Sequence, residues 1–527
     1  MRSAEILVGL LGAVTVLAGV ARRIGLPSPI VLVGCGLLVG LVPGLPTVTL
    51  DPDVVFFVFL PPLVYGAGFN SSPRDLRAQA RRIGILAIGL VAASTVAVAA
   101  VITLVVPGFG WPEAFVLGAI LSPTDPVAAV AIMQRLRVAP QLSAVIEGES
   151  LVNDGTGLVL YRLAIGATVS GTFSLLDGSW QLVATGAGGV AIGLAVGWVV
   201  HRIRARIEDP PIEITLSLFT PYAAYIAAEA AGASGILAAV TVGLFLGARS
   251  EGLFSATARI EAQGFWNALT FILESSLFLL MGLQIRDVAG GIENLDAGRV
   301  TLTVAVTLLV VLGVRVVWMF TMGPLLRRLI PGEPKGEPPD MGPGARLVAG
   351  WAGMRGAVSL AAALAIPAAT DAGDPFPQRS LIVFTVFAVI VLGLLLQGLT
   401  LPALIKATGL GRDEADDVAD EARARAAAAE AALARLDEMA HDTPDDEGRA
   451  TEHLRELYEA RLDHARAPQD ERGDDDRQHV EAFERVREEL LRSERAALHE
   501  LHARGEISED ALRTVERDLD LQEARLD

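Results

Sequence analysis

Histidine and cysteine are nearly absent from the first 410 residues of this chain, and their absence limits its chemistry. His201 is the one histidine that precedes residue 411, and Cys35 is the single cysteine of the whole sequence. A lone cysteine cannot form an intramolecular disulfide, so the sequence implies no oxidising compartment. Because imidazole and thiol groups are so few, we expect no cofactor, and we expect the chemistry of this part to depend on carboxylates.

Charged residues are also scarce, and they are unevenly distributed. Only 20% of the 527 residues are charged and 52% are hydrophobic, which is far too apolar for a soluble protein of this length. The formal net charge is −18, yet the tail from Gly411 onward holds 36 acidic and 18 basic residues while the residues before it hold 25 of each. The sequence therefore predicts a membrane-embedded domain followed by an acidic tail, with membrane lipid and not nucleic acid as its surroundings.

Apolar segments long enough for a helix to cross the hydrocarbon core, about 20 residues, recur before residue 408. The thirteen predicted spans are 4–21, 28–43, 52–70, 83–106, 112–134, 141–169, 179–201, 211–231, 233–248, 264–285, 299–326, 346–369 and 380–405. Basic residues follow the odd-numbered segments, from Arg22 and Arg23 to Lys406, and such residues concentrate on the cytoplasmic side. We therefore expect a multi-pass protein of the cell membrane, with its N-terminus outside and its C-terminus in the cytoplasm.

Two predicted spans contain residues that interrupt a helix. The fifth contains Ser122-Pro-Thr-Asp-Pro126, in which each proline removes a backbone donor. The twelfth contains the glycine-rich stretch Gly350 to Gly356 around Arg355. These spans are seven apart, so they cross the membrane in opposite directions. The fold predicted is an all-α membrane protein of about thirteen transmembrane helices, with two inverted six-helix repeats and two broken helices that cross where such transporters bind ions.

The tail, residues 408–527, differs from the membrane domain, residues 1–407, in composition. It contains runs rich in alanine, glutamate, arginine and leucine, separated by short stretches with proline, glycine or aspartate. One run repeats apolar residues at helical spacing from Phe483 to Leu501, which indicates a helix that packs against a partner. We expect a soluble, cytoplasmic helical hairpin or small bundle with a regulatory or interaction role.

The sixth predicted span carries the densest group of polar residues. Ser150 and Asp154 are four residues apart, as are Glu149 and Asn153, so these side chains line one sector of a helix. A small hard cation prefers oxygen ligands. The expected ligands are Asp154, Ser150, Thr124 and Asp125. Because a carboxylate shielded from water takes up a proton more readily than one in water, one such group could hold either a proton or a cation.

Arg355 requires an acidic partner, since a guanidinium is not neutralised and is costly to bury unpaired. We predict that Glu149 is this partner, which would connect the sixth span to the broken twelfth and leave Asp154 free for the ion. Glu274, near the middle of the tenth span, either faces the ion path or pairs with Arg315.

Three motifs together are similar to those of a known family. Ser-Pro-Thr-Asp-Pro-Val-Ala, Gly-Glu-Ser-Leu-Val-Asn-Asp-Gly-Thr-Gly and Trp-Ala-Gly-Met-Arg-Gly-Ala-Val-Ser occur in this order. They resemble the Na+/H+ exchangers of the monovalent cation:proton antiporter-1 family, of the bacterial NhaP-like type, over about residues 5–407.

The resemblance implies roles for individual residues. Asp154 would bind the ion and the proton as one of the pair Asn153-Asp154, while Ser150, Asp125 and Thr124 would contribute to the ion site. Glu149 and Arg355 would form a structural pair. The resemblance further implies electroneutral exchange of one cation for one proton, an elevator-like movement, and a homodimer formed through the membrane domain.

The third span departs from the family pattern. After Leu60-Pro-Pro-Leu63 many relatives carry an acidic residue near the site, where this chain has Val64-Tyr-Gly-Ala-Gly68. Gly66 offers no ligand, so water or Asn70 would fill that place.

The sequence thus favours a secondary antiporter of Na+ or Li+ against H+, and not an enzyme. A K+/H+ antiporter is the nearest alternative. A remote alternative is an intramembrane aspartyl protease that uses Asp125 and Asp154 as a dyad, although the Gly-x-Gly-Asp motif usual for that mechanism is absent.

Overall fold

The chain folds into helices that form two compact units, Met1–Arg412 and Asp413–Asp527. The computed structural model describes residues 2–43, 51–171, 175–207, 209–249, 256–329, 342–411, 414–440, 448–466, 474–504 and part of 506–523. Within these residues the regular elements are helices, accompanied by two isolated β-bridges. The expected all-α class is confirmed.

The first unit contains the apolar helices. In chain order, with η for π-helix, they are α1 (Arg2–Ile24), α2 (Ser28–Gly40), α3 (Pro52–Val54), η1 (Val55–Phe59), α4 (Leu60–Asn70), α5 (Pro73–Gly84), η2 (Ile85–Leu90), α6 (Val91–Val105), α7 (Trp111–Leu121), α8 (Val127–Arg135), α9 (Pro140–Ser170), α10 (Leu175–Arg204), α11 (Pro210–Ala230), α12 (Gly235–Gly247), α13 (Ala256–Leu283), α14 (Ile285–Gly290), α15 (Ala297–Leu329), α16 (Pro343–Trp351), α17 (Ala357–Leu364) and α18 (Arg379–Ala407). Gly25 and Gly171, with φ of 76° and 69°, follow the ends of α1 and α9, where a left-handed residue terminates a helix.

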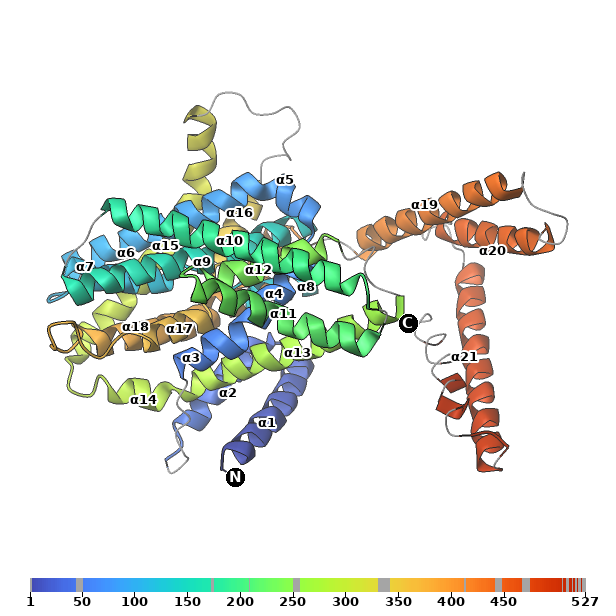
Figure 1. Cartoon of the computed structure of the whole chain (residues 1–527), viewed down its shortest axis with the longest axis horizontal. Coiled ribbons are helices and arrows are strands. Elements are labelled where there is room, and N and C mark those ends of the chain that lie inside the picture. The colour runs from blue at the N-terminus through green and yellow to red at the C-terminus, as the bar shows by residue number, and fades with distance from the viewer. Residues whose placement is uncertain are drawn as a thin grey trace. The chain divides into compact units, whose positions relative to one another are not determined.

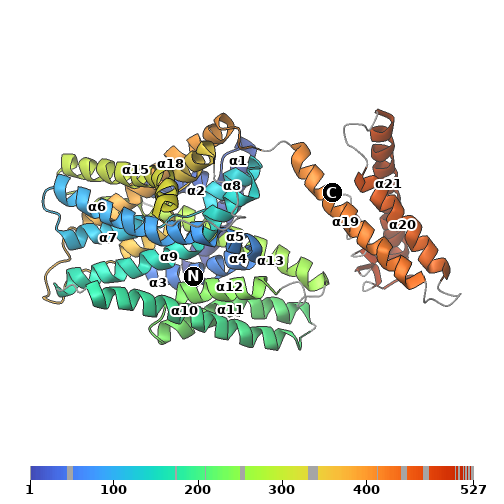
Figure 2. The same ribbon diagram turned by 90° about the horizontal axis from the view of Figure 1, so that it is seen from above.

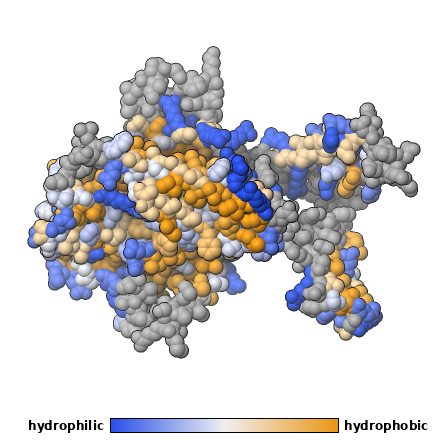
Figure 3. Space-filling model, in the orientation of Figure 1, coloured by the Kyte–Doolittle hydropathy of each residue, from blue (hydrophilic) through white to orange (hydrophobic). Residues whose placement is uncertain are grey.

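Several of these helices have the length and composition of membrane spans. Those that satisfy both within the described residues are Pro52–Asn70, Leu76–Val105, Val183–Arg204, Ala258–Gly290, Ala297–Met322 and Arg379–Ala407. Apolar residues cover much of the face of this unit shown in Figure 3, as lipid contact requires. The protein is therefore a multi-pass membrane protein, whereas the count of thirteen spans, the inverted repeats and the orientation of the termini stay predictions.

The long helix α9 lies in the middle of the first unit. In Figure 2 it runs between a layer that contains α10, α11 and α12 and a layer that contains α15 and α18. It contacts α7 and α5 as well as α10 and α12. Its polar residues are therefore enclosed by protein on several sides.

A π-helical turn precedes α4 for a reason visible in the sequence. Pro61 and Pro62 have no backbone N–H, so the carbonyls one turn earlier lose their usual donors. The Tyr222 hydroxyl donates to the carbonyl oxygen of Val58 at 2.9 Å. A side chain of α11 thus satisfies a backbone acceptor that the prolines leave open in lipid, where water does not compensate.

Two helices are interrupted where the sequence predicted. α7 ends at Leu121 and α8 begins at Val127, while α16 ends at Trp351 and α17 begins at Ala357. The backbone N–H of Asp125 donates to the carbonyl oxygen of Met354 at 2.7 Å, so the two interruptions meet. The prediction of two broken helices is confirmed, and their breaks are in contact.

The second unit consists of α19 (Glu414–Ala440), α20 (Gly448–Arg466) and α21 (Asp474–Ala503), together with described positions up to residue 523 (Figure 1). α19 and α20 pack as a hairpin, with ion pairs from Arg455 to Asp437 and from Arg466 to Glu430. The predicted helical hairpin is present within this unit.

Candidate ion-binding site

The first interruption is held against α9 by a network of hydrogen bonds around Thr124. The Ser150 hydroxyl donates to the Thr124 carbonyl oxygen at 3.0 Å, and the Asn153 amide donates to the Thr124 hydroxyl at 3.0 Å. The Thr124 hydroxyl in turn donates to a carboxylate oxygen of Glu149 at 3.2 Å. Three polar residues of α9 therefore fix one threonine of the broken helix.

A glycine of α9 makes this close approach possible. A Cβ atom at Gly157 would overlap the ring of Pro123. Because no side chain stands there, α9 lies directly against the interrupted segment, and the hydrogen bonds to Thr124 are within reach.

Asp125 lies where two half-helices begin. Its Oδ1 accepts a hydrogen bond from the N–H of Val127 at 2.9 Å, so it caps the start of α8. The start of α17 is also close, because a Cβ at Gly356 would overlap Asp125 Oδ2. The positive ends of both half-helices thus adjoin this one carboxylate, which favours a negative charge there.

Arg355 lies where the other two half-helices end. Its Nε donates to the carbonyl oxygen of Leu121, the last residue of α7, at 3.0 Å, and its Nη1 donates to the carbonyl oxygen of Gly353. Helix C-termini leave carbonyl groups without intrahelical donors. The buried guanidinium, 2% exposed, therefore satisfies carbonyls from both broken helices.

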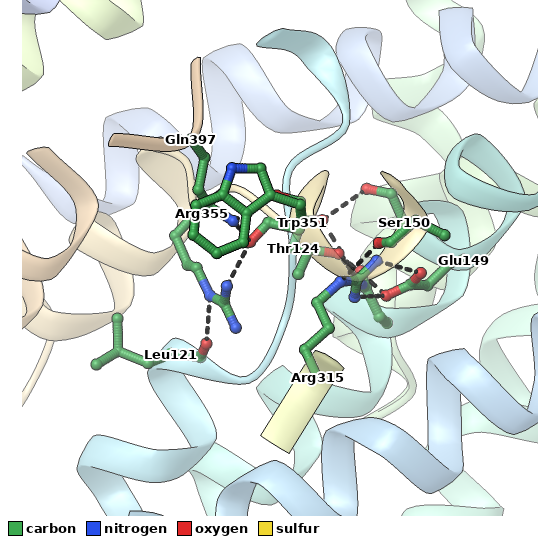
Figure 4. A network of polar contacts seen from close by, with 11 residues as sticks. Leu121, Thr124, Glu149, Ser150, Arg315, Trp351, Arg355 and Gln397 are labelled. Carbon is green, nitrogen blue, oxygen red and sulfur yellow. Dashed lines mark hydrogen bonds and ion pairs between the residues drawn. The ribbon is translucent and has the colours of Figure 1, made fainter. Parts of the chain in front are cut away.

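The predicted ion pair between Glu149 and Arg355 is wrong, because Glu149 pairs with Arg315 instead. Both carboxylate oxygens of Glu149 are bound by the guanidinium of Arg315 from α15, with Nη2 to Oε2 at 2.9 Å. Arg315 also donates from Nε to the Ala349 carbonyl oxygen of α16 at 3.2 Å. Figure 4 shows Arg315 directed at Glu149 and Arg355 directed at Leu121. The alternative that Arg315 pairs with Glu274 is wrong for the same reason.

The two arginines differ in partner because their N–H groups meet different acceptors. Arg355 donates to main-chain carbonyl groups that have no donor within their own helix, because the helix is broken there. Arg315 lies in a continuous apolar helix, where only a side chain from a neighbouring helix can answer its charge. The bidentate geometry with Glu149 is the strong form of such a contact.

A cavity of about 490 Å³ opens beside the crossing. Four carboxylates line it: Asp125, Glu147, Asp154 and Glu274. Hydroxyl and amide groups of Thr124, Ser150, Ser359, Thr270, Asn70, Asn267 and Gln134 also line it. This is a set of oxygen-bearing ligands, the type that a hard monovalent cation accepts.

The two acids of the α9 motif are in opposite situations. Glu149 is saturated by Arg315 and Thr124 and is 1% exposed. Asp154 lines the cavity and, among the described residues, forms no hydrogen bond or ion pair. The structure therefore leaves Asp154 available for a ligand and withdraws Glu149 from one.

Asn153 does not line the cavity. It is fully buried, with 0% exposure, and its amide N–H₂ binds Thr124. Its Oδ1 is buried with no hydrogen-bond donor in the described part of the chain. The structure thus places it beside the ligand set as a support of Thr124.

The position of α4 near which many relatives carry an acid holds Gly66 in this chain. A Cβ at Gly66 would face Trp266 and Thr270 at 3.6 and 3.7 Å, and Gly66 does not line the cavity. Glu274, one helical turn after Thr270 on α13, does line it, as does Asn70. An acid from α13 therefore stands in the cavity that lacks one from α4.

The sequence suggested an ion pair for Arg315 but with Glu274, whereas the partner in the structure is Glu149. The signal for an ion pair was present, since a single arginine in the apolar run of α15 must find a carboxylate inside the protein. Several acids lie in the apolar segments, and sequence spacing does not say which helix faces which.

The chain is similar to known proteins along most of its length. Residues 10–407 match the family model described as "Sodium/hydrogen exchanger, transmembrane". An uncharacterized Na+/H+ exchanger of Mycobacterium tuberculosis is 35% identical, covering 99% of this chain and 96% of the relative. A sodium, potassium, lithium and rubidium/H+ antiporter of Bacillus pumilus is 35% identical over 72% of this chain and 58% of its own length.

The fold also has a solved counterpart. The structure of the sodium proton antiporter of Methanocaldococcus jannaschii at pH 8 superposes with a TM-score of 0.61. It covers 78% of this chain and 99% of that one at 19% identity. This likeness concerns the helical architecture.

Proposed function

Since the chain belongs to the family of sodium/hydrogen exchangers, we propose that Asp154 alternately binds a monovalent cation and a proton in the cavity beside the crossing. The protein is a secondary transporter of cations and protons, not an enzyme, so the alternative of an aspartyl protease falls away. Na+ or Li+ is the proposed cation, exchanged for H+.

The observation that carries the proposal is that the Asp154 carboxylate has no hydrogen-bond or ion-pair partner among the described residues. Its carboxylate lies in a cavity lined by oxygen-bearing side chains, and no described residue binds it. A cation and a proton satisfy such a group equally well in charge, so each displaces the other. Ser150, Thr124 and Asp125 are the proposed additional ligands, and Asn153 acts through its hold on Thr124.

Glu274 and Asn70 are proposed as a second layer of the same site. Glu274 lines the cavity from α13 and forms no hydrogen bond or ion pair within the described residues. We propose that it attracts the cation and contacts it through water. Replacing it by glutamine should lower the apparent affinity for the cation and leave some exchange.

A one-for-one exchange follows from a single exchanging carboxylate. If Asp154 holds one cation or one proton but not both, no net charge crosses in a cycle. We propose that the exchange is electroneutral, and that an elevator-like movement of the broken-helix bundle within a homodimer carries the site across. Rates that do not respond to an imposed membrane potential support the first part, and crosslinking of purified protein tests the dimer.

A K+/H+ antiporter is the second candidate, favoured by one comparison. The relative from Bacillus pumilus is named for sodium, potassium, lithium and rubidium. The cavity of about 490 Å³ has room for a larger or a partly hydrated ion. One experiment separates the two candidates.

The test is cation-driven proton movement in proteoliposomes that contain the purified protein and an internal pH dye. Chloride salts of Na+, Li+, K+ and Rb+ are added in turn. Asp154→Asn should abolish every response, while Glu113→Gln, which removes a carboxylate of α7 outside the cavity, should leave the responses intact. Wild-type rates in Asp154→Asn would refute the assignment of the site.

The acidic tail is proposed to regulate the exchanger. Removing residues 413–527, which form a separate compact unit, should leave exchange in place and shift its dependence on pH. Loss of exchange in a well-folded truncated protein would show instead that the tail is part of the transport machinery.

A further inference from the structure

A second cavity lies at one end of the first unit. Its volume is about 630 Å³, and it is bounded by the last turns of α1, α8 and α18 and the start of α2. α2 contacts α1, α8 and α18, and α8 contacts α18; the labels of the four helices lie together in Figure 2. Ala131 of α8 lines both cavities, but Asp154 and the other proposed ligands line only the first, so the function above does not account for the second.

Three basic side chains line this cavity, each from a different helix: Arg22, Arg135 and Lys406. Among the described residues no acidic side chain lines it. Arg135 donates to the Gly25 carbonyl oxygen, and the Arg22 guanidinium lies 5.9 Å from the ring centre of Phe271. The Lys406 ammonium forms no hydrogen bond or ion pair within the described part of the chain.

A basic residue in the last turn of a helix stabilises that helix by itself, and this accounts for each of the three separately. It does not account for their convergence on one cavity, where like charges repel. An anion bound between them would remove this repulsion. Arg135 and Lys406 retain donors that such an anion can use, because a guanidinium has five N–H groups and an ammonium has three.

The remaining walls say what kind of anion fits. They are apolar, with Leu26, Ile132, Leu399 and Pro402 among them. Leu399 is 53% exposed, on a helix that has the length and composition of a membrane span. Basic cavities between helix ends with apolar sides open to lipid bind the head groups of anionic phospholipids.

We propose that this cavity binds an anionic phospholipid, with its phosphate between Arg22, Arg135 and Lys406 and its acyl chains along the apolar wall. These helix ends are those that the distribution of basic residues predicts to face the cytoplasm, the leaflet in which anionic lipid is enriched. The bound lipid connects α1 and α2 with α8, the half-helix that begins beside Asp125. Its occupancy should therefore stabilise the membrane unit.

The test titrates the purified full-length protein in detergent with phosphatidylglycerol and follows thermal unfolding. Phosphatidylcholine and inorganic phosphate are titrated in parallel. Lys406→Gln removes no hydrogen bond of the described structure, and Arg135→Gln/Lys406→Gln removes two charges. Arg206→Gln, an exposed basic residue outside this cavity, is the matched control.

Phosphatidylglycerol should raise the unfolding temperature of the wild-type protein and of Arg206→Gln alike. The half-saturating lipid concentration should rise about 5-fold for Lys406→Gln and about 30-fold for the double variant, since each basic residue near an anionic surface is worth about 1 kcal/mol. The proposal is overturned if both variants respond like the wild type. It is equally overturned if phosphatidylcholine or inorganic phosphate produces the same rise, because the site would then not select an anionic lipid.

Discussion

The two interrupted helices carry opposite charges at their breaks, and the structure uses each charge at the matching helix ends. Asp125 adjoins the starts of α8 and α17, and Arg355 adjoins the ends of α7 and α16. The acid lines the cavity of about 490 Å³, whereas the arginine is 2% exposed and absent from its lining. One break therefore places a carboxylate at the cavity, and the other places a buried guanidinium on the helix ends.

The same contrast separates the two buried arginines. Arg315 forms an ion pair with the carboxylate of Glu149, whereas Arg355 donates hydrogen bonds to main-chain carbonyls. Removing a partner from the first leaves a full charge buried without compensation, while changing the second leaves only polar groups unsatisfied. The costs should differ accordingly.

The largest effect is expected at the ion pair. Glu149→Ala should lower the free energy of unfolding by about 3–5 kcal/mol, because Arg315 then stays buried as an unpaired charge. Adding Arg315→Met should restore part of the loss, whereas adding Arg355→Met should not. Thermal unfolding of the three variants in detergent measures this, and rescue by Arg355→Met alone would favour the pairing that the sequence suggested.

A smaller loss is expected when the guanidinium of Arg355 is replaced. Arg355→Gln should cost about 1.5–3 kcal/mol, the range for hydrogen bonds that involve a charged group. Arg315→Gln should cost more, because it strands the Glu149 carboxylate. Unfolding temperatures of the two variants, compared at matched expression, give the ranking, and the reverse order would contradict the comparison of the two arginines.

Gly356→Ala tests the close contact between the breaks. The added Cβ would overlap Asp125 Oδ2, and such overpacking costs about 1–3 kcal/mol. Because the added Cβ displaces Asp125, a proposed ligand, the rate of exchange in proteoliposomes should fall even in protein that is still folded. Gly166→Ala is the control, since a Cβ there meets open space on α9. Equal exchange by both variants would argue that Asp125 does not depend on this contact.

The smallest effect is expected at Ser359, whose hydroxyl donates to the carbonyl oxygen of Ile120 at 2.8 Å and so connects α17 to α7. Ser359→Ala should cost about 0.5–1.5 kcal/mol, the net value of one hydrogen bond. Thr168→Ala, which removes a bond within α9 only, should cost less. If the unfolding temperature of Ser359→Ala falls no further than that of the control, this bond does not hold α17 against α7.

Much of the site could be predicted from the sequence because its signals are local. The prolines around Asp125 and the glycines around Arg355 determine where the helices break, since backbone donors and helix propensity are properties of the residues themselves. The spacing of Ser150 and Asp154 places both side chains on one sector of α9, and both line the cavity. These features needed no knowledge of neighbouring helices.

The sequence by itself determined that the chain is a helical membrane protein with charged residues inside its apolar segments. Only the tertiary structure decided the partner of each buried charge. Arg315 pairs with Glu149, and Arg355 binds the carbonyl groups at helix ends. Glu274 lines the cavity, which Gly66 does not. The reason is physical. A buried charge requires a partner of opposite sign, and that requirement can be read from one residue, but several partners satisfy it, and helix packing selects among them.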